Sequence, residues 1–128
     1  MLSGNFFDIQ SITFDECEVA QQKCTVVVSL NANHPIYLGH FPGSPVVPGV
    51  CQVQMVKEII ETIVKYPVRL READNIKFLS MINPQVNSQL EFHIHIKPAN
   101  DQLLSATATI GYGKFVFLKF KGKFEPTG

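Results

Sequence analysis

The sequence predicts an α+β fold in which an antiparallel sheet wraps around one long helix. One segment, residues 49–65, carries apolar residues at steps of three and four, as a helix does. The segments on both sides of it alternate apolar and polar residues, with the period of two that is typical of strands. Because two strands come before the helix and four come after it, we expect a single sheet around one helix.

Two strands are expected before the helix. Residues 6–13 form the first, and residues 24–30, Cys-Thr-Val-Val-Val-Ser-Leu, form the second. The second is β-branched through its centre, which favours an extended backbone.

The helix of residues 49–65 is apolar over most of its circumference, so we expect it to be buried against the sheet. Pro67 marks its end, because proline does not continue a helix. Its periodic apolar residues are Val50, Val53, Met55, Val56, Ile59, Ile60, Ile63 and Val64.

Four strands are expected after the helix. Turn-forming pairs and short runs separate them, such as Asn83-Pro84 and Gly111-Tyr112-Gly113. The expected strands cover residues 75–81, 89–97, 103–111 and 114–123.

Composition narrows the class of protein. The 128 residues suit one domain, residues 1–128, and the charges balance at eleven basic and eleven acidic residues. No basic stripe is evident, so we expect no nucleic-acid partner. The apolar runs are shorter than the roughly 20 residues of a membrane helix, and no secretory signal is recognised, so we expect a cytoplasmic protein without a membrane segment.

His93 and His95 share a strand face but lack a third ligand nearby, so no metal is expected.

The segment from His34 to Val50 is the strongest functional signal. It holds four prolines, three glycines and two histidines in seventeen residues, directly before the helix. Proline restricts the backbone, so we expect His40 to be held in one orientation. The first N–H groups of the helix, those of Gly49 and Val50, have no intrahelical acceptor and carry partial positive charge. A fixed imidazole beside such donors suits acid–base chemistry on a carbonyl compound.

This segment resembles the signature of the FabZ-type 3-hydroxyacyl-acyl carrier protein dehydratases. The shared pattern is Gly-His-Phe-Pro, two residues, Pro, two residues and Pro-Gly-Val, at residues 39–50. The resemblance implies a hot-dog fold, a lyase reaction in fatty acid or related lipid or polyketide synthesis, and His40 as a catalytic residue. It also implies a homodimer or higher oligomer, an acyl carrier protein that presents a phosphopantetheine-linked substrate, and no cofactor. Phe41 is an open case: it lines an acyl channel or belongs to the core.

Two positions depart from the family pattern, as if their residue types were exchanged. The family places a carboxylic acid fourteen residues after the histidine, where this chain has Gln54, and often a glutamine one turn later, where it has Glu58. Glutamine has no transferable proton, and losing a general acid typically costs ~10² to 10⁴ in rate. Three replacements are open: Glu58 itself, His40 as a proton shuttle, or a water held by Gln54.

Two other functions stay open. An acyl thioesterase on the same fold places an acidic residue on the helix to direct water at the thioester. Alternatively, the chain is an acyl-thioester-binding subunit without activity of its own, or the inactive half of a heterodimeric dehydratase whose partner supplies the acid. Gln54 favours this last interpretation.

Overall fold

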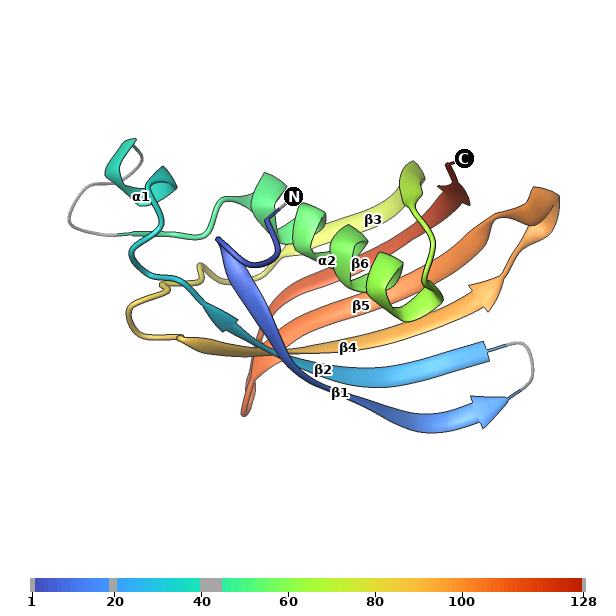
Figure 1. Cartoon of the computed structure of the whole chain (residues 1–128), viewed down its shortest axis with the longest axis horizontal. Coiled ribbons are helices and arrows are strands. Elements are labelled where there is room, and N and C mark those ends of the chain that lie inside the picture. The colour runs from blue at the N-terminus through green and yellow to red at the C-terminus, as the bar shows by residue number, and fades with distance from the viewer. Residues whose placement is uncertain (1, 19–20, 40–44, 128) are drawn as a thin grey trace.

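The structure, a computed structural model, describes residues 2–18, 21–39 and 45–127 (Figure 1). These residues form two α-helices, a short 3-10 helix at Asn100–Gln102, and six strands. The helices are α1 (Ile36–Gly39) and α2 (Gly49–Val64). The strands are β1 (Phe7–Glu18), β2 (Gln21–Leu30), β3 (Val68–Phe78), β4 (Gln89–Pro98), β5 (Leu104–Tyr112) and β6 (Phe115–Pro126).

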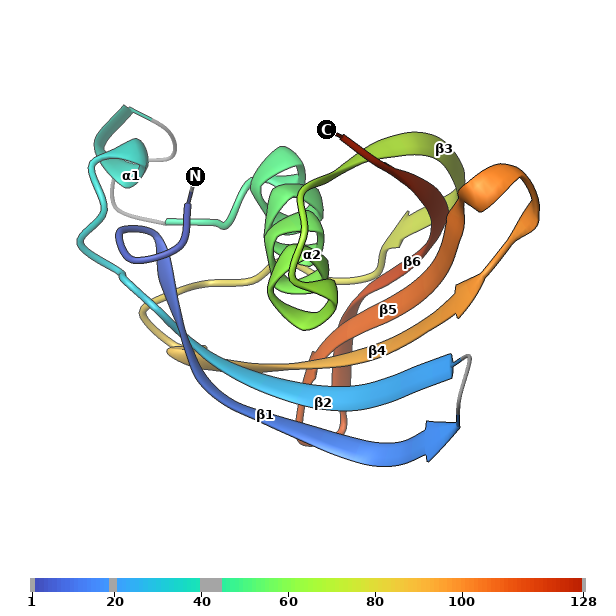
Figure 2. The same ribbon diagram turned by 45° about the vertical axis from the view of Figure 1, so that its right-hand side comes forward.

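The strands form one antiparallel sheet in the order β1-β2-β4-β5-β6-β3, so β1 and β3 are its edges. The sheet curves around α2, which lies along its concave face (Figure 2). The predicted fold class is therefore confirmed. Among the described residues, no helix is both long enough and apolar enough to cross a membrane.

The core fills the space between α2 and the concave face. Alternate residues of the central strands point inward, because successive side chains of a strand face opposite sides of a sheet. The fully buried side chains of α2 are Met55, Val56, Ile59 and Ile60; those facing them from the sheet include Val26, Val28, Leu90, Phe92, Ile110, Leu118 and Phe124.

α2 ends as the sequence predicts. Lys65 follows it in the left-handed conformation, with φ 67°, and its N–H donates to the Glu61 carbonyl oxygen at 2.8 Å. This bond satisfies one of the carbonyl groups left free at a helix C-terminus. Pro67 lies two residues beyond and leads into β3.

β3 begins at Val68, well before the expected start at residue 75. The first part of this edge strand carries charged residues on its exposed side, which hides the alternation that identifies a strand. The structure pairs these residues across the strands: Arg69 and Arg71 both contact Glu125 of β6. The single turn of α1 was also not predicted, because four residues are too few to show a helical period.

Candidate functional site

The histidine-bearing segment is anchored on both sides by the framework. Before it, Tyr37 of α1 is buried against Phe6, with ring centroids 5.8 Å apart, and the His34 ring meets the Phe6 ring edge-on at 5.2 Å. After it, the Val47 N–H donates to the Ile82 carbonyl oxygen at 2.9 Å. The chain therefore enters and leaves the segment at fixed points.

His40 and Phe41 themselves lie in residues 40–44, outside the described part of the chain. The fixed orientation of His40 and the channel role of Phe41 therefore remain predictions. Figure 1 shows α1 at the left of the view and α2 across the middle, with the N-terminal end of α2 as the end nearer to α1.

The start of α2 offers two backbone donors. Pro48 precedes the helix in an extended conformation, and its carbonyl oxygen accepts from the N–H groups of Cys51 and Gln52 at 3.0 and 3.1 Å. No side chain caps this end, and within the described residues the N–H groups of Gly49 and Val50 have no acceptor. Free N–H groups at a helix N-terminus attract a negatively polarised oxygen.

An open groove of about 680 Å³ lies beside this first turn. Its walls are mainly apolar, and Phe78, Leu79 and Met81 each expose about half or more of their surface. Gly49 packs directly under the Phe78 ring: a Cβ at residue 49 would lie 2.8 Å from the ring carbon Cζ. The residues that line the groove are Val46, Gly49, Gln52, Phe78, Leu79, Ser80 and Met81.

Gln52 is a groove residue that the sequence analysis missed. Its side chain is 3% exposed, and its Nε2 donates to the Val47 carbonyl oxygen at 3.2 Å. Its Oε1 is buried and has no hydrogen-bond donor among the described residues. The signal was available in the helical period, because Gln52 shares the buried stripe with Met55 and Ile59, three and seven residues later. A polar residue at such a position needs a partner.

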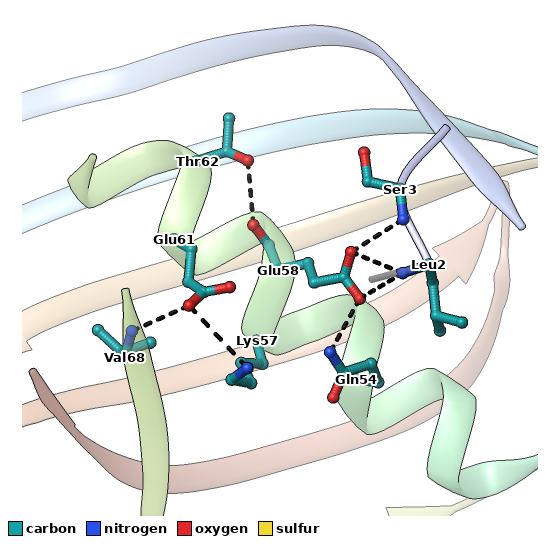
Figure 3. A network of polar contacts seen from close by, with 8 residues as sticks. All are labelled: Leu2, Ser3, Gln54, Lys57, Glu58, Glu61, Thr62 and Val68. Carbon is teal, nitrogen blue, oxygen red and sulfur yellow. Dashed lines mark hydrogen bonds and ion pairs between the residues drawn. The ribbon is translucent and has the colours of Figure 1, made fainter. Parts of the chain in front are cut away.

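Gln54 and Glu58 lie further along α2 and contact one another (Figure 3). The Gln54 Nε2 donates to Glu58 Oε2 at 2.9 Å. The same carboxylate accepts from the Leu2 N–H at 2.8 and 3.0 Å and from the Ser3 N–H at 2.9 Å. Through these hydrogen bonds, Glu58 holds the segment before β1 against the middle of α2.

The surroundings of Glu58 stabilise its ionised form. Its side chain is 3% exposed, and burial alone raises the pKa of a carboxyl group. The hydrogen bonds from the Leu2 amide, the Gln54 side chain and the Ser3 amide outweigh burial, so the pKa of Glu58 is lowered from its ordinary value. A carboxyl group that stays ionised at neutral pH is a poor proton donor.

A second hollow, of about 430 Å³, lies on the sheet face opposite α2. His93 and His95 are among its lining residues; Thr25 Oγ1 lies 3.3 Å from His93 Nδ1, and Gln21 Oε1 lies 3.0 Å from His95 Nε2. Within the described residues, no group of three or more potential ligands could hold a metal ion. We place the candidate site at the start of α2, because the backbone donors of Gly49 and Val50 and the apolar groove lie together there.

An antiparallel sheet wrapped around one long helix is the hot-dog fold. The comparisons agree. The family model ApeI-like, described as ApeI dehydratase, matches residues 16–123, and the chain belongs to this family. A solved structure titled the dehydratase heterocomplex ApeI:P from Xenorhabdus doucetiae superposes with a TM-score of 0.58 at 19% identity, covering 90% of this chain and 98% of that chain. An uncharacterised protein from Erwinia carotovora subsp. atroseptica gives 0.66 at 22% identity, covering 93% and 94%.

Curated relatives support the FabZ resemblance. The chain is 30% identical over 76 residues to the 3-hydroxyacyl-[acyl-carrier-protein] dehydratase FabZ of Wolbachia pipientis wMel, covering 54% of this chain and 52% of the relative. It is 28% identical over 94 residues to the FabZ of Rickettsia massiliae, covering 67% and 65%. The matches thus span between half and two thirds of these relatives' length.

Proposed function

We propose that this protein is a dehydratase or hydratase of acyl thioesters, acting on 3-hydroxyacyl chains carried by an acyl carrier protein. The observation that carries the proposal is the pair of N–H groups at Gly49 and Val50, which have no acceptor in residues 2–18, 21–39 and 45–127 and begin the helix that follows the His40 segment directly. Membership of the ApeI-like family supports it.

The reaction removes a proton from C2 and hydroxide from C3, giving a 2-enoyl thioester and water. His40 takes the C2 proton, since an imidazole with a pKa near 6.5 is matched to neutral pH. The electron pair moves onto the thioester oxygen, which the N–H groups of Gly49 and Val50 stabilise. The leaving oxygen at C3 must then receive a proton.

Glu58 is not the proton donor in this proposal. Its carboxylate accepts hydrogen bonds from three groups, and its pKa is lowered, so we assign it a positioning role. Two of the three replacements remain: His40 returns the proton it took from C2, or a water held by Gln54 donates it. Gln54 has a second N–H and a carbonyl oxygen available for such a water.

In this proposal a second subunit completes the substrate side of the site. The two subunits form a homodimer, which the resemblance to FabZ-type dehydratases implies. Phe78 and Met81 of the groove wall are 53% and 76% exposed, and Val50 in the first turn of α2 is 77% exposed. Exposed apolar surface of this kind is typical of interfaces. A partner chain that supplies the acid is the second candidate, because Gln54 replaces it here and a structural neighbour is titled a dehydratase heterocomplex.

The test follows the ultraviolet absorbance of a 2-enoyl thioester during hydration. We expect His40→Ala to lower turnover by roughly 10² to 10⁴-fold, the usual contribution of a general base. Glu58→Gln should keep most of the turnover per folded molecule, and Gln54→Glu should raise it about a hundredfold by restoring the acid.

Other outcomes decide between the alternatives. If Glu58→Gln abolishes turnover while Gln54→Ala does not, Glu58 is the acid after all. If activity appears only when a second hot-dog protein is added, the heterodimer is correct. If free thiol is released without loss of the double bond, the protein is a thioesterase.

A further inference from the structure

The first turn of α2 contains a hydrogen-bond acceptor for which the described part of the chain supplies no donor. Gln52 Oε1 is buried and unpaired among the described residues, while Nε2 of the same amide donates to the Val47 carbonyl oxygen. Turning the amide over would set its oxygen against that carbonyl oxygen, so the observed orientation is the favourable one. An unpaired buried acceptor is energetically costly, so a donor that reaches it is bound favourably.

The position of Gln52 connects this acceptor with the free backbone donors. Side chains of a helix lean toward its N-terminus, so the amide of Gln52 extends back along the first turn toward Gly49. Its bond to Val47, which precedes the helix, confirms that direction. Gln52 and Gly49 line the same groove. A ligand oxygen at the Gly49 and Val50 N–H groups therefore lies close to a second recognition point.

The groove walls indicate what carries the matching donor. Phe78, Leu79 and Met81 form an apolar wall, which suits an acyl chain. The pantetheine arm has two amides, each with a donor and an acceptor to satisfy, whereas a 3-hydroxyacyl chain has one hydroxyl. A single buried acceptor within an apolar wall matches a single donor on an apolar chain.

We propose that Gln52 is a specificity-determining residue, whose Oε1 accepts a hydrogen bond from the 3-hydroxyl group of the acyl chain. This inference rests on the proposed function, with His40 returning the proton, because Gln52 and Gln54 are two residues apart and do not share a helix face. It adds the means by which a hydroxyacyl chain is distinguished from a saturated one. A site built to bond a hydroxyl rejects the analogue that lacks it, because its own polar group is then left unpaired.

The experiment measures binding without turnover. Two pantetheine ligands of equal chain length, one 3-hydroxyacyl and one saturated, are joined through an amide in place of the thioester and titrated by calorimetry. We expect the wild-type protein to bind the hydroxyacyl ligand about tenfold more tightly, the effect of one hydrogen bond. Gln52→Met should reduce that ratio to about one by weakening the hydroxyacyl ligand alone. Gln85→Met, the same change at an exposed loop position, should leave the ratio unchanged.

Three results would overturn the inference. The first is an affinity ratio in Gln52→Met that equals the wild-type ratio. The second is an equal loss of affinity for both ligands in Gln52→Met, which assigns the acceptor to the pantetheine arm. The third is equal binding of both ligands by the wild-type protein. If neither ligand binds, the proposed function itself fails. Should Gln52→Met not fold, the side-chain N–H resonances of Gln52 in the wild-type protein replace it: they should shift with the hydroxyacyl ligand and not with the saturated one.

Discussion

The two halves of α2 differ in whether their polar groups have hydrogen-bond partners. Around Glu58, three donors converge on one carboxylate, from Leu2, Ser3 and Gln54 (Figure 3). Around the first turn, the N–H groups of Gly49 and Val50 and the Oε1 of Gln52 have no partner among the described residues.

This difference separates a structural cluster from a binding site within one helix. Buried polar groups in folded proteins are nearly always paired, and the Glu58 carboxylate is paired without any ligand. The unpaired groups lie instead beside a groove with an exposed apolar wall. Glu58, a candidate from sequence, therefore belongs to the structural half, and Gln52 belongs to the binding half.

The largest expected effect is a loss of stability when the hydrogen-bonded cluster around Glu58 is removed. Glu58→Ala removes the acceptor shared by Leu2, Ser3 and Gln54 and should lower the free energy of unfolding by about 3 kcal/mol. Glu58→Gln keeps one side-chain oxygen and should cost less. Urea unfolding measures both, with Glu91→Ala on the exposed sheet face as the control. If Glu58→Ala is as stable as the control, the cluster does not hold the segment before β1 in place.

The sequence was sufficient for the helix and the sheet but not for this division. Period-two and period-three-to-four patterns report burial, so they located α2 and the six strands, except for the charged first half of β3. They do not report which polar groups meet. The contact between Glu58 and Leu2 spans 56 positions in the chain, and no local pattern indicates it. The burial of Gln52 could have been predicted, because its place on the buried stripe of α2 is visible in the sequence.

Acidification should give a smaller effect, because it removes only the stability that the ionised form of Glu58 contributes. The folded pKa of Glu58 is lowered, so its stabilising contribution is present above the unfolded pKa and is lost as pH falls through the folded value. We expect the stability difference between wild type and Glu58→Gln to be constant near neutral pH and to shrink below about pH 4.5. Urea unfolding of both proteins over this range measures it. Glu125, whose pKa Arg69 lowers, is present in both proteins and cancels. A difference that grows on acidification would mean that Glu58 is protonated when folded.

The smallest expected effect concerns the groove, where Gly49 and Phe78 touch. In Gly49→Ala the new Cβ would lie 2.8 Å from Phe78 Cζ, but that ring is 53% exposed and free to turn away. We expect a loss of less than about 1 kcal/mol in stability, since a side chain moves rather than the backbone. A double-mutant cycle isolates the contact: in a Phe78→Ala background, Gly49→Ala should cost nothing, because the ring it meets is gone. An equal cost in both backgrounds would place the strain in the helix start itself. The free N–H groups would then be held by the backbone of the first turn and not by the groove wall.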